Sequence, residues 1–245
     1  MSDLVRLLSP KYPPVAIFHT DTFPSYAQEP EREHCCIKSM FIPCVTEGRA
    51  VAADGSMVRC AGALNGLGLG GENPEGRTKL AEYYSDGPSG DDGRRFFCDR
   101  DHARSNYLEQ VEVYGSRDDI AVMRPLEDAM AAGDPIETVV FYVDPLELSA
   151  LMTLAQFSGE PRDSCARCGF ALACEHLYAV PRQEGESDSP RLVLGMTEFY
   201  PRRFCDPDRL TVSMPYSLFE RLEKDAPYSF LADGRWRGPA RQDDA

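Results

Sequence analysis

Residues 138–157 constrain the fold more than any other stretch of this sequence. The segment from Thr138 to Val143 consists of β-branched and aromatic residues, which is typical of a buried strand. Asp144 and Pro145 follow it directly. They are residue types preferred at the N-cap and first position of a helix, which we expect to run to about Phe157. A strand that leads into a capped helix indicates a sheet covered by helices.

Short apolar runs and helical patterns alternate along the rest of the chain. We expect further strands at 15–18, 50–53, 191–194 and 210–214, and helices at 3–9, 35–45, 60–69, 125–132, 168–180 and 215–225. This order predicts an α/β or mixed α+β fold, a sheet with alternating helices in a single compact domain over residues 1–233. The Gly-, Pro-, Ser- and Asp-rich loop near 85–95 is the best place for an internal boundary, and a polar tail is expected at 234–245.

The charge balance excludes one large class of partners. The 245 residues include 26 Lys and Arg against 40 Asp and Glu, a net charge of −14. Nucleic acids are bound through clustered cations, so we expect no nucleic-acid partner. An acidic surface suits a positively charged protein, such as a redox partner, and a homodimer is the commonest assembly for soluble oligomers.

The sequence carries no signal for a membrane or for export. No stretch approaches the ~18 consecutive apolar residues of a membrane-spanning helix. The first residues also lack the basic and apolar regions of a secretory signal. We therefore expect a cytoplasmic protein without a membrane partner.

Nine cysteines stand out against an otherwise ordinary composition. They occur at positions 35, 36, 44, 60, 98, 165, 168, 174 and 205. Without export, disulfides are not the default role of cysteines in a chain rich in them, and an odd number fits a disulfide framework poorly. The cysteines are therefore expected to bind a metal, to carry out redox chemistry or to be buried as small apolar side chains.

Three of these cysteines, Cys165, Cys168 and Cys174, form a C-x2-C-x5-C pattern. Two thiolates three residues apart can bind one metal ion, and three or four thiolates suit an iron–sulfur cluster or zinc. The alternative is that the cysteines are buried on a helix, because Cys168, Ala171 and Cys174 have helical spacing.

A second set lies in the N-terminal half, at Cys35, Cys36, Cys44 and Cys60. Adjacent cysteines rarely bind one metal together, so we expect one of Cys35 and Cys36 to be a ligand and the other to pack. Cys60 precedes a run of small residues that opens a helix, and a helix N-terminus lowers the pKa of a thiol. Burial in the core is the alternative for each of these cysteines.

Other chemistry-bearing patterns are weaker. His34 and His176 lie near cysteines and could be metal ligands or proton carriers, although isolated histidines more often have structural roles. The run from Gly66 to Gly71 matches G-x-G-x-x-G, but it follows a predicted helix rather than a strand, so we expect no nucleotide site there. The sequence contains no nucleophile elbow, H-E-x-x-H zinc motif or P-loop.

Several spaced segments together resemble the DUF169 family over residues 10–225. The resemblance rests on His34-Cys35 and the run 60–69 in the N-terminal half, and on 139–148, 174–181, Gly195-Met196 and 210–215 in the C-terminal half. The family is largely uncharacterised and typical of anaerobic archaea and bacteria. Cysteines at the positions of Cys35, Cys60 and Cys174 recur in it, which implies that these three converge and bind an iron–sulfur cluster.

The resemblance leaves the fourth ligand open. Many members of the family have a cysteine after the glycine that matches Gly195, where this sequence has Met196. Cys205, Cys165 or Cys168 could replace it. Cys174 belongs to both the local pattern and the family pattern.

The resemblance therefore implies a cytoplasmic [4Fe–4S] protein with a redox or electron-transfer role. One alternative is a zinc-stabilised module that binds a small molecule, since zinc uses the same thiolates. Another is a thiol enzyme in which Cys60 or Cys174 is the nucleophile and His34 or His176 is the base. The last is a ligand-binding domain whose cysteines are only buried. No motif identifies a substrate.

Overall fold

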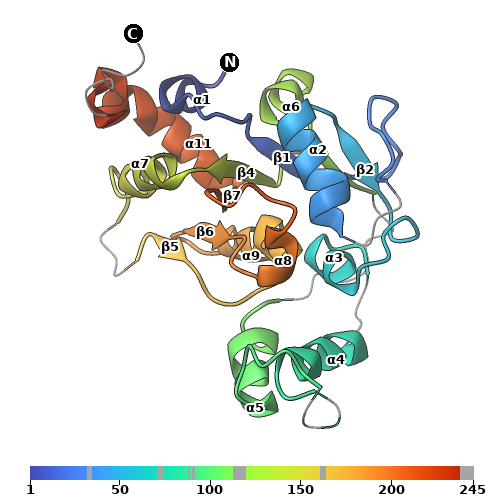
Figure 1. Ribbon diagram of the computed structural model, residues 1–245. Helices are drawn as coiled ribbons and strands as arrows, with labels where there is room; N and C mark the ends of the chain where they lie inside the picture. The colour runs from blue at the N-terminus through green and yellow to red at the C-terminus, as the bar shows by residue number, and fades with distance from the viewer. Residues whose placement is uncertain are drawn as a thin grey trace.

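Seven strands form one sheet in the computed structural model, which describes residues 1–31, 35–70, 74–87, 89, 92–112, 120–160 and 164–237. The strands are β1 Val15–Thr20, β2 Val51–Ala53, β3 Ile120–Pro125, β4 Thr138–Val143, β5 Ala166–Arg167, β6 Leu192–Gly195 and β7 Leu210–Pro215 (Figure 1). Their order across the sheet is β2, β3, β1, β4, β7, β6, β5.

Of these strands, all neighbours are antiparallel except β5 and β6, which are parallel. Strand β1 sets Val15 opposite Pro125 of β3 on one side and opposite Val140 of β4 on the other. β4 pairs with β7 along its whole length, from Thr138 opposite Pro215. The sheet is mixed, and the predicted α/β or mixed α+β fold in a single domain is confirmed.

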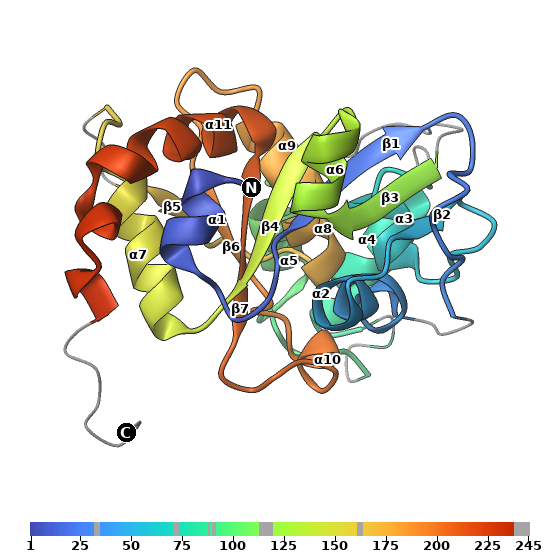
Figure 2. The ribbon, with the colours of Figure 1, turned by 90° about the horizontal axis from the view of Figure 1, so that it is seen from above.

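Helices cover both faces of the sheet. Those nearest to it are α1 Asp3–Leu8, the π-helical turn η1 Ile37–Phe41, α2 Ile42–Glu47, α3 Ala61–Gly66, α6 Leu126–Ala132, α7 Pro145–Ala155, α8 Ala173–Leu177, α9 Ala179–Glu184, α10 Phe199–Arg202 and α11 Tyr216–Asp225. Alternate residues of each strand point to opposite faces. Phe18 of β1 shares a hydrophobic cluster with α1, α6, α7 and α11, whereas Ile17 shares one with η1, α2, α3 and α8. The helices α1, α7 and α11 gather around β4 and β7 (Figure 2).

A third hydrophobic cluster forms a helical layer beyond α3, on the side away from α1 and α11 (Figure 1). It contains α4 Pro74–Tyr84, α5 Arg100–Ala103 and the π-helical turn η2 Arg104–Leu108. Tyr84 and Tyr107 of this layer pack in one cluster with Leu172 and Val193. The loop near 85–95 belongs to the same layer, and backbone hydrogen bonds join it to the end of α4; residues 88, 90 and 91 lie outside the described part.

The C-terminal end continues α11 in three short 3-10 turns, η3 Ala226–Tyr228, η4 Phe230–Asp233 and η5 Arg235–Arg237. The rest of the expected polar tail, 238–245, lies outside the described residues. Within the described ranges, no helix combines the length and the apolar composition needed to cross a membrane.

The unit of β4 and α7 forms as the sequence predicts. The Asp144 side chain accepts hydrogen bonds from the backbone N–H groups of Leu146 and Glu147, and the Glu147 carboxylate accepts one from the backbone N–H of Asp144, all at 2.9 Å. This reciprocal capping box satisfies N–H groups that the first turn leaves free. Pro145 occupies the first helical position.

The sequence predicts no counterpart for α4, α5, α10 and β5, and three further elements differ from the prediction. The expected helix over 168–180 is wrong in its extent: α8 begins only at Ala173, because the backbone of Leu172 is extended. The helix expected over 35–45 starts with the π-helical turn η1, because Pro43 has no N–H to continue an α-helical ladder. β3 has no predicted counterpart, since its apolar run from Ile120 to Met123 is short and pairing with β1 and β2 makes it a strand.

Candidate functional site

Four thiols from three separate segments meet between α3 and α8. Cys60 is the N-cap of α3, Cys174 lies in the first turn of α8, and Cys35 and Cys36 directly precede η1. The thiol of Cys174 forms hydrogen bonds with those of Cys36 and Cys60. Cys35, Cys60 and Cys174 line a cavity of about 240 Å³, the cysteine cavity, whose walls are otherwise mainly apolar and aromatic. All nine cysteines are free thiols.

Two glycines of α3 allow its close approach to α8. A Cβ added at Gly66 would lie 2.6 Å from the backbone nitrogen of Glu175 and 2.7 Å from the carbonyl carbon of Cys174, closer than Cβ atoms pack. A Cβ at Gly62 would lie 3.6 Å from the sulfur of Cys60 and 3.8 Å from that of Cys174. The small residues after Cys60 therefore have a packing role, because they bring the two sulfurs to one cavity.

The thiols of the cysteine cavity differ in their affinity for protons. A hydrogen bond from Cys174, helped by the backbone N–H groups of Ala63 and Gly62, lowers the pKa of Cys60 to about 6 against the opposing effect of burial. Hydrogen bonds with Cys36 and Cys60, together with burial, hold the pKa of Cys174 well above its usual value. Burial raises the pKa of Cys35 to about 12. At neutral pH, Cys60 is a thiolate beside the protonated thiols of Cys35 and Cys174.

A buried carboxyl group also lines the cysteine cavity. Glu198 is 7% exposed, and its oxygens accept hydrogen bonds from the Tyr84 hydroxyl at 2.9 Å and from the backbone N–H of Ala173 at 3.1 Å. Burial raises the pKa of Glu198 above its usual value. A carboxyl group in such surroundings can hold or release a proton near the thiols.

A second carboxyl group supports the same helix from behind. Glu175 accepts hydrogen bonds from the backbone N–H of Leu172 at 2.7 Å and from the Tyr107 hydroxyl at 3.0 Å, and burial raises its pKa to about 7. Glu175 and Glu198 together bind the N–H groups of Leu172 and Ala173, which begin α8. Cys174 is thereby fixed in position in the first turn.

The three cysteines of the C-x2-C-x5-C pattern, Cys165, Cys168 and Cys174, do not lie at one site. Cys165 is half-buried and packs against the hydrophobic cluster on the opposite face of the sheet. Cys168 is exposed and lies before α8 rather than on it. Of this trio, only Cys174 reaches the cysteine cavity.

Cys205 and Met196 lie beside each other in the cluster that contains the cavity cysteines. The Cys205 sulfur is 3.9 Å from the Met196 sulfur and 3.5 Å from the carbonyl oxygen of Pro201. Met196 is 1% exposed and has a positive φ of 60°. Neither residue belongs to the described lining of the cysteine cavity.

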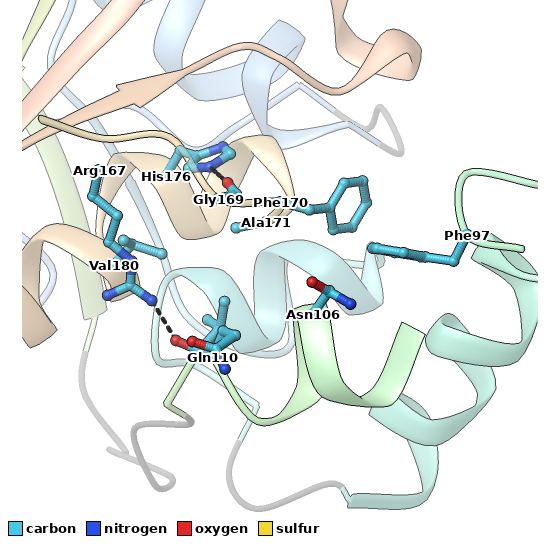
Figure 3. A pocket seen from close by; sticks show the side chains of 10 residues that line it. Phe97, Asn106, Gln110, Arg167, Gly169, Phe170, Ala171, His176 and Val180 are labelled. Atoms are coloured by element: carbon cyan, nitrogen blue, oxygen red, sulfur yellow. Dashed lines mark hydrogen bonds between the residues drawn. The ribbon is translucent and has the colours of Figure 1, made fainter. Parts of the chain in front are cut away.

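His176 faces a different cavity, of about 310 Å³, which it shares with Arg167 and Phe170 (Figure 3). Its Nε2 lies 3.1 Å from the carbonyl oxygen of Gly169, and its buried Nδ1 has no hydrogen-bond partner within the described chain. Burial lowers the pKa of His176 to about 4, so the ring is neutral at pH 7. The second histidine near a cysteine, His34, lies outside the described residues.

A separate group of metal-binding atoms lies on the surface at the start of α5. Cys98, Asp99 and His102 bring one ligand atom each within 4.8 Å of the others. Asp99 is the N-cap of α5, and its carboxylate accepts hydrogen bonds from the backbone N–H of His102 at 2.9 Å and from the Cys98 thiol at 3.3 Å. These are helix-capping contacts at an exposed turn.

The sequence does not predict two features of the cysteine site, the contact of Cys36 with Cys174 and the presence of Glu198. The first is the contact of Cys36, which is 3% exposed and whose thiol bonds to that of Cys174. Glu198 stands alone in a loop, and no local pattern marks it. Its contact with Ala173, 25 residues earlier, arises only from the tertiary fold.

The comparison with protein families gives one match. The model of the DUF169 family, described as "Uncharacterised ArCR", matches residues 3–225. No curated protein and no solved structure matches the chain.

Proposed function

The chain belongs to the DUF169 family, and from this premise and the geometry of the cysteine cavity we propose a cytoplasmic iron–sulfur protein with a redox or electron-transfer role. Cys35, Cys60 and Cys174 would hold one [4Fe–4S] cluster, whose chemistry is to accept and donate an electron. The observation that carries the proposal is that thiols from three distant segments line one cavity.

The spacing of the thiols does not match the compact group that a single zinc ion binds. Thiolates around one tetrahedral zinc lie ~3.8 Å apart, given Zn–S bonds of ~2.3 Å. Of the described residues, only Cys98, Asp99 and His102 place three ligand atoms all within 4.8 Å of one another. The thiol of Cys174 bonds to those of Cys36 and Cys60, but no three of the described cavity thiols meet this limit together. Gly62 leaves room between Cys60 and Cys174, because it has no Cβ.

The surroundings of the thiols also suit this role. The backbone N–H groups of Gly62 and Ala63 point at the Cys60 sulfur, and hydrogen bonds to sulfur tune the potential of a cluster. The walls around the thiols are largely apolar. Glu198, with a raised pKa, can hold a proton next to the site.

The structure also offers a fourth thiol. Cys36 is 3% exposed and bonds to Cys174, whereas Cys165 and Cys168 lie elsewhere and Cys205 contacts Met196. We therefore prefer Cys36 as the fourth ligand. The expectation that only one of Cys35 and Cys36 is a ligand concerns a single metal ion, whereas the cysteines of a cluster would bind different irons.

Single substitutions of the cavity cysteines test the proposal. We expect Cys35→Ser, Cys60→Ser and Cys174→Ser, purified without oxygen, to lose most of the iron and acid-labile sulfide that the wild type carries. Cys168→Ser and Cys98→Ser are the matched controls, because both cysteines are exposed and lie outside the described cavity lining, and they keep the wild-type content. Equal iron in all five variants would refute the assignment of the site.

The variant Gly62→Ala tests whether iron can be lost while the protein stays folded. The added Cβ would meet the Leu172 Cδ1 at 2.8 Å, a flexible side-chain end, and would enter the space between the two sulfurs. We expect a folded variant, judged by circular dichroism, with less iron per chain than the wild type.

A thiol enzyme is the second candidate, favoured by one observation. Cys60 is a thiolate at neutral pH with an adjacent thiol, Cys174, in an accessible cavity. Among the described residues, Glu198 is a proton carrier that lines this cavity, whereas His176 faces another cavity.

Alkylation of the metal-free protein tests this candidate. Iodoacetamide should modify Cys60 at pH 7 faster than free cysteine, with an apparent pKa of about 6 that disappears in Cys60→Ser. No modification of Cys60 above the rate of free cysteine would rule out a reactive thiol.

A further inference from the structure

A second cavity opens directly beside the cysteine cavity. This outer cavity, of about 400 Å³, shares Tyr83, Tyr84 and Tyr200 with the cysteine cavity. Its remaining described walls are Arg94, Phe96, Phe199 and Arg203. The outer cavity thus adjoins the proposed cluster site, and Tyr84 belongs to the walls of both.

The walls of the outer cavity are aromatic and unusually exposed. Phe199 is 75% exposed, Tyr200 is 50% exposed and Tyr83 is 39% exposed. The rings of Tyr84 and Phe96 are stacked with centroids 5.2 Å apart, and Phe199 meets Phe96 edge-on at 5.6 Å. Exposed apolar surface of this kind marks a binding site, and flat rings fit a flat ligand.

Two arginines give the outer cavity a charge opposite to that of the whole chain. Arg94 lies over the ring of Tyr83 at 5.2 Å, and Arg203 lies over that of Tyr200 at 4.1 Å. In the described part of the chain neither guanidinium forms an ion pair, although the net charge of the protein is −14. A guanidinium held on an aromatic face can bind a carboxylate or phosphate through two N–H groups. On Arg94 these are the terminal N–H groups, because its Nε donates a hydrogen bond to the Tyr83 hydroxyl at 2.5 Å.

We propose that the outer cavity binds a small planar aromatic anion, a carboxylate or a phosphate monoester. Its ring lies among the aromatic walls and its anionic group on Arg94 and Arg203. The Tyr84 ring lines both cavities and its hydroxyl donates to Glu198, so the ligand lies next to the thiol site. Binding of this ligand does not depend on the proposed function. Only its role as the compound on which the cysteine site acts rests on that function.

Fluorescence titration of the anaerobically purified full-length protein tests the inference. The probes are 2-naphthoate and 2-naphthyl phosphate, and the tighter of the two identifies the anionic group. 2-Naphthamide keeps the ring without the charge, and decahydro-2-naphthoate, competed against the fluorescent probe, keeps the charge without the planar ring. We expect both controls to bind at least about tenfold more weakly, because each lacks one of the two contacts.

Variants locate the site. Arg94→Gln and Arg203→Gln should each raise the Kd of the better probe about tenfold, since each removes a charge-assisted hydrogen bond. Arg6→Gln is the matched control, because Arg6 is on α1 and paired with Asp3 at 2.6 Å. The Kd of this control stays at the wild-type value.

The two proposals fail in different ways. Iron and sulfide are measured in the same samples as the probe titration. Probe binding without iron would refute the proposed function alone. Iron without probe binding, or binding that is equal in wild type, Arg94→Gln and Arg203→Gln, would overturn the outer cavity as an anion site.

Discussion

The cysteine cavity contains one thiol, that of Cys60, whose pKa is lowered. Hydrogen bonds from Cys174 and from two backbone N–H groups lower the pKa of Cys60 to about 6, while the pKa values of Cys35 and Cys174 are raised. Before any metal binds, Cys60 therefore already carries a negative charge at pH 7. The remaining thiols would lose their protons on ligation, which couples cluster binding to proton release.

Glu184 is a buried charged residue in α9, outside the cysteine cavity. It is 4% exposed, and its oxygens accept hydrogen bonds from the backbone and guanidinium of Arg191, at 2.7–3.1 Å, and lie 3.4 Å from Arg167. Burial alone would raise the pKa of Glu184, but its partners, chiefly Arg191, lower it below the usual 4.5. The carboxylate thus ties α9 to β5 and to the start of β6.

The lowered pKa of Glu184 makes its contribution depend on pH. The carboxylate stabilises the fold above about pH 4.5, and that contribution is lost as the pH falls through the lower folded-state value. We expect Glu184→Gln to reduce the free energy of unfolding by about 2–4 kcal/mol at pH 7. Urea unfolding at pH 7, 5 and 3 measures this, with the exposed Glu186→Gln as control. A difference from wild type that does not shrink at pH 3 would contradict the assignment.

At the scale of elements, the contact between α3 and α8 sets the geometry of the site. Both helices are short, so neither positions its cysteine alone. Glycines on α3 allow backbone contact, and the carboxylates of Glu175 and Glu198 hold the first turn of α8. Cys60 and Cys174 therefore meet because two helix N-termini are brought together.

Gly66→Ala tests this contact. The added methyl group would collide with the backbone of Cys174 and Glu175, which cannot rotate away, so we expect a loss of about 1–3 kcal/mol in the free energy of unfolding. Gly169→Ala is the control, because a Cβ there meets nothing within 4 Å. Chemical denaturation of both variants measures the difference. Equal stability would show that α3 and α8 are not in close contact.

The parts of the fold that the sequence predicts are those with local causes. β4 and α7 follow from six strand-forming residues and an Asp-Pro cap, and the structure reproduces both. β3 and the start of α8 depend on partners far along the chain. β3 needs β1 and β2 beside it, and α8 begins where distant and local carboxylates bind its first N–H groups.

The cysteine site also depends on contacts between residues far apart in the chain, which local patterns do not predict. The local spacing of Cys165, Cys168 and Cys174 groups residues that the fold keeps apart, whereas the family resemblance groups Cys35, Cys60 and Cys174, which the fold brings together. Proximity in space between residues far apart in the chain leaves no trace in periodicity. For the same reason, no local sequence pattern predicts that Glu198 and the aromatic residues of the outer cavity belong to a site.

At the scale of the whole molecule, the cysteine cavity lies where three parts of the fold meet. The helices η1 and α3 belong to one face of the sheet, α4 belongs to the separate helical layer, and α10 supplies Tyr200 and Pro201. The opening beside it carries two arginines on an otherwise acidic protein. This arrangement places the thiol site beside a cavity that carries two cationic side chains.

The central claim is that the cysteine cavity holds an iron–sulfur cluster, and the metal content of the wild-type protein tests it most directly. Iron, zinc and acid-labile sulfide are measured per chain after purification without oxygen, together with the visible spectrum. The account predicts about four iron and four sulfide per chain and a brown protein. One zinc per chain without sulfide, or a colourless protein with neither metal, would contradict it.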